Sequence, residues 1–437
     1  MSPAIFHAGP RPAGLWATAY GWALCALAFF LPLFFNTQSI SLVVLSVCGL
    51  GLLVRGKGQL VWRTQGILWL LYFAAYSLSA ICSTDKAAAL DDWSRKLGMP
   101  LMAVFIGLMP CISKSQFGKV AAAYILGNLL SMVWCIGYVL ATATPVTRAA
   151  FFNDDLVHGL EYNAAYTSLH VFMALVLLIL PPGGALPAFI TRVRWPLAVL
   201  LWGFLLFLGS KLLVALGALL WIVAAARRAR QAVGTRRREA LAVAVMLTGI
   251  TAFFLVVNGD QLAARYDSLR AGVPTAAPVT APNHPPAGEA DNLTKRRIMW
   301  KATWLAYRRE GGWPVLGLGS GDLQRRVAAE VSRPGFTFGH YRDFAQLAGM
   351  NAHNMYLQSL AAAGIPALLL LLAMVGWGMY GAWRSRALSA VAFWIVAGLF
   401  LAQESALQTQ AGLFPICFFS LLFANTIPSK RTEVEYN

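Results

Sequence analysis

A histidine and three carboxamide side chains precede a long apolar run near the C-terminal end of the sequence. Asn351, His353, Asn354 and Gln358 stand in NAHNMYLQSLAAAGIP, and residues 361–378 are almost entirely apolar. A helix N-terminus disfavours imidazolium and attracts phosphate, so a histidine there can accept a proton as a general base beside a bound anion. These residue types fit attack on a pyrophosphate-linked carbon, although His353 could also be an interfacial histidine and Asn354 a helix cap.

Three further groups of polar residues stand at the ends of apolar runs. Lys211 follows a Gly-Ser turn in LGSKLL, Arg265 stands in LAARYDSLR, and Glu161 and Asn163 stand in LEYNAAY. The cations could meet an anionic lipid headgroup or a phosphate, and Glu161 could supply a carboxylate. Each group also has a structural interpretation: a snorkelling lysine, a solvated loop with a local ion pair, and an asparagine that caps a helix.

A basic helix is predicted over residues 291–310. In DNLTKRRIMWKATWLAYRREGG, the residues Arg297, Lys301, Trp304 and Arg308 follow helical spacing. One face is therefore basic with an aromatic side chain beside it. This face could lie at the membrane interface, or its arginines could grip phosphate, and the two interpretations are compatible.

The sequence lacks the spacing of a metal or nucleotide site. No Asp-x-Asp occurs, the six cysteines form no CxxC pair, and PVLGLGSGD at 314–322 has no Walker lysine. We expect that glycine-rich stretch to form a tight turn packed beneath the basic helix, and the cysteines to be small buried hydrophobes. No metal and no cofactor are predicted.

The composition predicts an all-α polytopic membrane protein. Of the 437 residues, 58% are hydrophobic and 12% are charged, whereas about 25% are charged in an average soluble protein. Apolar runs long enough to cross a bilayer recur along the chain. We expect about twelve transmembrane helices, at residues 14–35, 39–54, 66–82, 98–112, 118–142, 165–181, 195–209, 211–226, 240–258, 354–381, 387–402 and 411–427.

Lysine and arginine gather in the loops on one side of this bundle. The chain has 35 of them against 18 Asp and Glu, and residues 227–239 alone carry six arginines. By the positive-inside rule these loops, and both termini with them, are cytoplasmic. The basic runs are then topology signals and contacts with anionic membrane lipids rather than a nucleic-acid site.

Three informative loops remain for the exoplasmic face, and the longest divides the chain. Residues 1–258 contain the first nine transmembrane helices, and residues 354–437 contain the last three and a cytoplasmic tail. The large loop between them, 259–353, begins with a segment rich in Pro, Ala and Gly at 271–290, which we expect to be flexible.

Together these motifs resemble the O-antigen ligase/polymerase superfamily of bacterial envelope glycan enzymes. The family pattern has Ser-Arg at a span start, an Arg-x-x-x-Trp helix in the large loop, a Gly-x-Gly turn after a proline, and His-Asn followed by nine residues and Gly. Here the Arg-led helix is RIMWKATW, from Arg297 with Trp at 300 and 304, the turn is PVLGLGSG, and HNMYLQSLAAAG runs from His353 to Gly364. The chain departs from the pattern at Lys211, which replaces the arginine, and at Ala367, where the family often has a second glycine.

The resemblance implies a GT-C-type glycosyltransferase of the bacterial inner membrane, with a large periplasmic loop that contains helices and with its active site on the periplasmic side. The donor would be an undecaprenyl diphosphate-linked glycan, and the acceptor a sugar hydroxyl of lipid A–core. His353 would deprotonate or position that hydroxyl, and direct displacement would invert the anomeric carbon. Arg297, Lys211, Arg265 and Lys301 would hold the diphosphate in place of a metal, and Asn354, Gln358, Glu161 and Asn163 would position a sugar.

Other functions share parts of this pattern. An O-antigen polymerase or a protein O-oligosaccharyltransferase would use the same donor chemistry with another acceptor. We favour the ligase because one long loop carries both the arginine helix and the histidine motif. A lipid-linked glycan transporter would be expected to show repeated halves and charges inside several spans, and the sequence shows neither.

Overall fold

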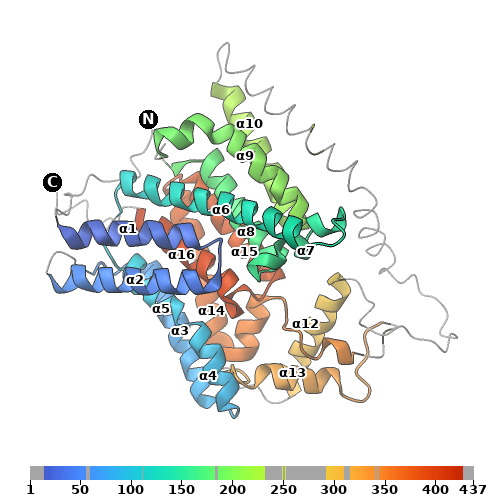
Figure 1. Ribbon diagram of the computed structural model, residues 1–437. Coiled ribbons are helices and arrows are strands. Elements are labelled where there is room, and N and C mark those ends of the chain that lie inside the picture. Colours follow the sequence, from blue (N-terminus) through green and yellow to red (C-terminus); the bar gives the residue numbers. More distant parts are fainter. Residues whose placement is uncertain are drawn as a thin grey trace.

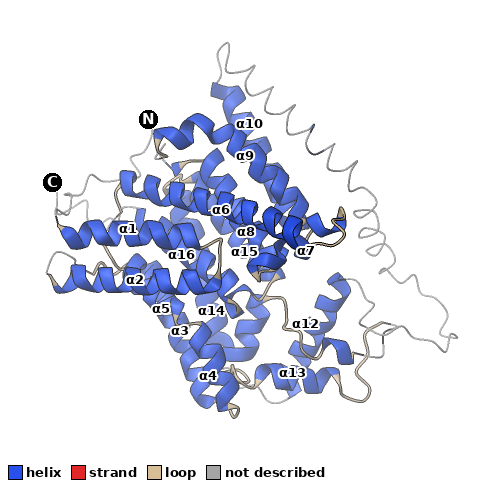
Figure 2. Cartoon of the chain, viewed as in Figure 1, coloured by secondary structure: helices blue, strands red, loops and turns tan. Residues whose placement is uncertain are grey.

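The computed structural model describes residues 14–55, 60–110, 112–182, 186–231, 249, 251, 292–309, 315–339, 341 and 344–426. Within these ranges every regular element is a helix, and isolated bridge residues, such as Phe338 and Tyr341, form no strand (Figure 2). The expected span 240–258 lies outside the described residues except for Gly249 and Thr251, and Arg265 and the segment 271–290 lie outside them entirely. Each of the other expected spans except 98–112 overlaps a described helix over most of its length.

Within the part of the chain that the structure describes, five helices are long and apolar enough to cross a membrane. A sixth span arises if the pair Asp154–Leu160 and Ala164–Ile179, bent by 83°, is counted as one. The chain is therefore a multi-pass membrane protein, while the number twelve stays a prediction. The five long helices are α2 (Phe35–Val54), α3 (Thr64–Cys82), α6 (Lys114–Thr142), α9 (Ala188–Leu208) and α14 (Met355–Arg384).

The remaining helices are shorter or more polar. Apolar ones are α1 (Leu15–Phe30), α8 (Ala164–Ile179), α15 (Leu388–Gln403) and α16 (Gln410–Thr426), and α10 (Lys211–Gln231) ends in the basic run. Four further helices fall between the expected spans: α4 (Lys86–Arg95), α7 (Asp154–Val157), α12 (Asn292–Arg309) and α13 (Leu323–Val331). The expected span 98–112 is a short α5 (Gly98–Met102) that continues as a π-helix, η1 (Ala103–Gly107).

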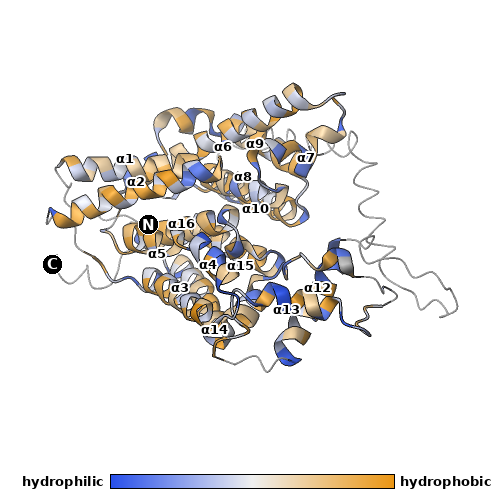
Figure 3. Cartoon of the chain, turned by 60° about the horizontal axis from the view of Figure 1, so that its bottom comes forward, coloured by the Kyte–Doolittle hydropathy of each residue, from blue (hydrophilic) through white to orange (hydrophobic). Residues whose placement is uncertain are grey.

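The outer surface of the bundle is apolar, as a lipid-facing surface must be. On α2, Ile40, Val43, Val47 and Leu50 are each more than half exposed. A soluble monomer rarely leaves so continuous an apolar stripe uncovered. Polar residues gather instead where α4, α12 and α13 lie, which we call the loop end of the bundle (Figures 1 and 3).

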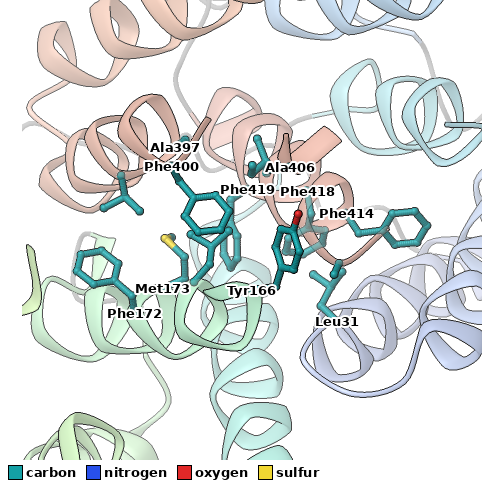
Figure 4. Close-up of a cluster of buried hydrophobic side chains, with 14 of the residues drawn as sticks. Leu31, Tyr166, Phe172, Met173, Ala397, Phe400, Ala406, Phe414, Phe418 and Phe419 are labelled. Atoms are coloured by element: carbon teal, nitrogen blue, oxygen red, sulfur yellow. The ribbon is translucent and has the colours of Figure 1, made fainter. Parts of the chain in front are cut away.

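Helix α8 forms the centre of the core and supports the loop end. Nearly all of its residues are buried, and Tyr166 packs edge-on against Phe400 of α15 with ring centroids 5.8 Å apart. Around them, Phe418 and Phe419 of α16 fill the space between the three helices, whereas Phe414 points away from this cluster, toward Gly98 of α5 (Figure 4). Aromatic pairs in these geometries stabilise packing beyond the effect of the buried area alone. The helices on either side of the α15–α16 loop are therefore held firmly against each other.

Helix α14 is kinked about two and a half turns after its start. Gly364 has φ 79° and ψ −174°, and Pro366 follows it inside the helix. Proline lacks an N–H and a non-helical residue breaks the ladder, so the carbonyls of Ala361 and Ala362 lose their partners within the helix. Ser79 on α3 donates its hydroxyl to the carbonyl of Ala362 at 2.6 Å.

The glycine-rich turn of the large loop fills the rest of this kink. The N–H of Leu318 donates to the carbonyl of Ala361 at 2.7 Å, and that of Gly319 to the carbonyl of Ala362 at 3.2 Å. At Gly317, with φ +66°, a Cβ would lie 2.7 Å from that same Ala361 carbonyl oxygen. The turn therefore needs glycine for its backbone and for its contact with α14, and it ties the large loop to the bundle.

Gly321 makes the closest approach of this turn to helix α4. A Cβ there would lie 2.4 Å from the carbonyl oxygen of Asp85 and 2.6 Å from the N of Ala89, both backbone atoms. We expect Gly321→Ala to lower the free energy of unfolding by about 1–3 kcal/mol, the usual cost of overpacking. Thermal unfolding of the purified protein checks this. Gly349→Ala is the matched control, because Gly349 has open space around its Cβ position, and an equal loss in both variants would contradict the argument.

Candidate active site

His353 stands at the loop end in an uncommon backbone conformation. Its φ is 45°, a region in which histidine is among the more tolerated residues. The His353 N–H donates to Asn351 Oδ1 at 3.0 Å, and Asn354 then caps α14 by accepting from the N–H of Leu357 at 3.0 Å. Such a conformation costs about 1–3 kcal/mol and persists where its surroundings hold it. The two asparagines hold it here.

The imidazole of His353 contacts a buried carboxylate that is distant in the sequence. Its Nδ1 lies 2.9 Å from Oε2 of Glu404, which ends α15 and is 8% exposed in its side chain. If Nδ1 carries the proton and donates to the carboxylate, Nε2 keeps its lone pair. The His353 ring is one-quarter exposed, so a group arriving at the loop end can reach it.

Arg296, which belongs to the large loop, contacts the same carboxylate as His353. We call Arg296, His353 and Glu404 the active-site group. Nη2 of Arg296 forms an ion pair with Oε1 of Glu404, so the two oxygens of one carboxylate are divided between a guanidinium and an imidazole. Arg296 is 27% exposed, and its remaining N–H donors stay available to an anion. Helix α12, α14 and the α15–α16 loop therefore meet at a single acidic side chain.

The neighbouring basic residues of α12 are oriented differently. Arg297 is exposed, because consecutive helical residues are rotated by about 100°. Lys301 donates to the carbonyl of Thr337 at 2.5 Å and lies over the ring of Phe336. The basic face predicted from Arg297, Lys301, Trp304 and Arg308 is thus exposed, but the residue that contacts Glu404 is Arg296.

The other predicted site residues lie in several places. Asn163 caps α8 by accepting from the N–H of Tyr166 at 3.1 Å, whereas Glu161, at φ 61°, is exposed. Gln358 is buried one turn into α14, and Lys211 begins α10 with an exposed side chain. Tyr166 of α8 packs against Phe400 of α15, four residues before Glu404, so the start of α8 adjoins the end of α15.

Sequence reasoning missed Arg296 and Glu404 for different reasons. In the pattern Arg-x-x-x-Trp, the count to Trp300 starts from Arg296 and not from Arg297, so the correct spacing was present. Glu404 is 51 residues from His353. Its only sequence signal is that it is a lone acid between two apolar spans, in LAQESALQTQ.

Asp322 fixes the large loop to the residues at the start of α4. Its Oδ2 accepts from the N–H of Thr84 at 2.6 Å, and its Oδ1 accepts from the Thr84 hydroxyl at 2.6 Å and from the N–H of Asp85 at 3.0 Å. Burial raises the pKa of Asp322, but these donors outweigh it and hold the pKa below its ordinary value of 3.8. Asp85 in turn caps α4, so one carboxylate joins the glycine turn to the start of that helix.

The contribution of Asp322 to the stability of the fold depends on pH, and the direction of the shift in its pKa fixes the sign of that dependence. A carboxylate whose pKa is depressed by folding stabilises the fold above its unfolded pKa and loses that contribution as pH falls through the folded value. We expect Asp322→Asn to unfold at a lower temperature than the wild type at neutral pH, and the two melting temperatures to converge as pH drops below 3.8. Parallel thermal melts across that range measure the gap. A gap that stays constant would contradict a role for the charge.

Comparison with known proteins gives one match. A family model described as O-antigen ligase matches residues 196–372. The matched region begins in α9, ends in α14, and includes Arg296, the glycine turn and His353, but not Glu404. No curated protein matches the chain significantly.

Proposed function

The chain belongs to the O-antigen ligase/polymerase superfamily, and from this premise we propose that it ligates an O-antigen glycan from undecaprenyl diphosphate to a sugar hydroxyl of lipid A–core. The observation that carries the proposal is the contact of His353 with Glu404 at 2.9 Å, shared with Arg296. A base, a carboxylate that orients it and an exposed cation are the parts needed to activate a hydroxyl beside an anionic leaving group.

The proposed reaction is a single displacement. The acceptor hydroxyl gives its proton to Nε2 of His353 while its oxygen attacks the anomeric carbon of the donor sugar. The bond from that carbon to the phosphate oxygen breaks, and its electron pair leaves with undecaprenyl diphosphate. Attack from the face opposite the leaving group inverts the anomeric configuration. Glu404 stabilises the imidazolium that forms, as a carboxylate does beside a histidine base.

Cationic side chains would stabilise the leaving diphosphate. Arg296 is the closest described candidate, because it already lies beside Glu404. The exposed Arg297 would meet the diphosphate from the same helix, and Lys211, Arg265 and Lys301 are proposed as further contacts. Arginine suits this role because its planar fork matches phosphate oxygens. We propose that four polar residues also position sugars, in addition to any structural role such as helix capping: Glu161, Asn163, Asn354 and Gln358.

The proposed orientation places the loop end in the periplasm. The basic loops that the positive-inside rule assigns to the cytoplasm, among them residues 227–239, would then lie at the opposite end of the bundle. Both termini would be cytoplasmic in the bacterial inner membrane. A lipid-linked donor in the periplasmic leaflet would have its diphosphate at the level of His353.

The test is a transfer assay with the purified protein in lipid nanodiscs. Undecaprenyl diphosphate-linked O-antigen and lipid A–core are supplied with chelator and without nucleotide. Ligated product is the expected result. Lengthened donor chains formed without lipid A–core would identify a polymerase, glycan attached to an added protein acceptor would identify a protein O-oligosaccharyltransferase, and movement of the donor across the bilayer without bond formation would identify a transporter.

A further inference from the structure

The segment that joins α15 to α16, residues 404–409, is fixed at two points. At its start, Glu404 contacts His353, and the hydroxyl of Ser405 accepts from the N–H of Asn354 at 3.2 Å. Both contacts belong to the group described above. At its end the segment contacts a different part of the chain, through Gln408.

The second contact is made by a lysine from the α4–α5 connection. Nζ of Lys96 donates to Oε1 of Gln408 at 3.2 Å, across 312 residues of sequence. Between Gln408 and Glu404 lies a single turn, η7 (Ala406–Gln408), closed by the N–H of Gln408 donating to the carbonyl of Ser405 at 2.9 Å. A displacement of Gln408 is therefore passed to Glu404 through one hydrogen-bonded turn.

Lys96 is buried in a way that stability alone does not explain. Its side chain is 1% exposed, forms an ion pair with Asp92 and lies 4.9 Å from the ring centroid of Tyr76. Burial lowers the pKa of Lys96, and Asp92 opposes that shift. A buried ion pair is often no more stabilising than an apolar pair of the same volume, so the ammonium needs another role. A lysine only donates, so the Gln408 oxygen must face it.

We propose that Lys96 is a positioning residue for Glu404, which acts through Gln408 and the η7 turn. Asp92 holds the ammonium in place, the ammonium fixes Gln408, and the turn sets where the Glu404 carboxylate meets His353. This inference rests on the proposed function for its activity test. Helix α4 would then connect the large loop to the α15–α16 segment. Its start is held by Asp322 of the large loop, and Lys96 at its end contacts Gln408.

The test uses two substitutions at Gln408. Lys96→Met alone would leave Asp92 buried without its partner and could prevent folding. Gln408→Met instead removes the acceptor and leaves the ion pair intact. Gln408→Glu keeps an oxygen toward Lys96, and its second oxygen replaces an Nε2 that has no partner among the described residues. Both variants are also made with Glu404→Ala.

We expect Gln408→Met to lower kcat by about 10- to 100-fold, the effect of a small misplacement in a site, with KM for the donor unchanged. Gln408→Glu should restore most of the rate. In the Glu404→Ala background Gln408→Met should cause no further loss. Amide hydrogen exchange in the peptide over 404–409 should be faster in the Met variant than in the Glu variant, whether or not transfer is assayed.

The outcomes separate this inference from the proposed function. If the wild type transfers glycan and Gln408→Met transfers it at the same rate, only the positioning role of Lys96 is overturned. An equal further loss in the Glu404→Ala background also overturns it, because Gln408 would then act independently of Glu404. A wild type without any transfer overturns the proposed function, and with unchanged hydrogen exchange in Gln408→Met it overturns the positioning role as well.

Discussion

His353→Ala is expected to lower the rate of glycan transfer by about 10²- to 10⁴-fold, the usual contribution of a general base. The acceptor hydroxyl would lose the group that takes its proton, while donor binding would be little changed. The measurement is the initial rate of ligation with both substrates saturating. His158→Ala is the matched control, because His158 is an exposed histidine whose described ring contact is with Tyr138. Its rate should stay within about two-fold of the wild type, as for ordinary surface changes.

A second substitution separates a base from a group that only orients the acceptor. Glu404→Gln keeps the shape of the side chain and an oxygen that can accept from His353, but removes the charge. If His353 takes the proton, the imidazolium loses its counter-ion and the rate falls with it, as for a histidine base deprived of its carboxylate. If His353 only orients the hydroxyl, Glu404→Gln keeps most of the rate. Full transfer by His353→Ala would refute both roles.

Local sequence features predicted the helices and their caps. Apolar runs gave the positions of α2, α3, α6 and α14 because a membrane helix satisfies its backbone internally and needs only an apolar surface. Asn354 and Asn163 were recognisable as possible caps because capping depends on a side chain and the backbone two or three residues later. Both caps are present in the structure.

Features that depend on distant residues were not predictable in this way. The expected span 98–112 ends early, at η1, because Arg63 donates to the carbonyls of Gly107 and Met109 at 3.0 and 2.6 Å. Asn425 similarly donates to the carbonyl of Ile106 at 2.7 Å. These side chains satisfy carbonyls that a longer helix would have bonded itself. No local pattern indicates which distant residue will do so.

The active site likewise combines a residue that local sequence could identify with residues that it could not. His353 was identified because it stands at a helix start, which is a local property. Glu404 was not assigned to the site because only the packing of α15 against α14 brings it beside the histidine. Lys96 was overlooked because a lysine in a polar loop is normally solvated. A charge that folding buries has no distinctive sequence signal.

Arg296→Ala is expected to lower kcat/KM by about 10²-fold or more, whereas Arg297→Ala should lower it by less than about 10-fold, since the loss of one directed donor to developing charge costs about 10²–10³. The two residues are adjacent in one helix, so the pair controls for net charge and helix content. Arg296 contacts the carboxylate that holds His353, while Arg297 is exposed. Arg296→Lys should fall between them, because lysine keeps the charge but not the planar fork.

Kinetic constants of Arg296→Ala and Glu404→Gln also show whether Arg296 only orients Glu404 or also binds the phosphate groups of the donor. If Arg296 mainly holds Glu404, its loss should resemble Glu404→Gln, with a lower kcat and an unchanged donor KM. If it also meets the diphosphate, donor KM should rise in Arg296→Ala but not in Glu404→Gln. Melting temperatures of both arginine variants show whether either change merely unfolds the site. A larger loss in Arg297→Ala than in Arg296→Ala would reverse the assignment, because the exposed guanidinium would then be the one that meets the donor.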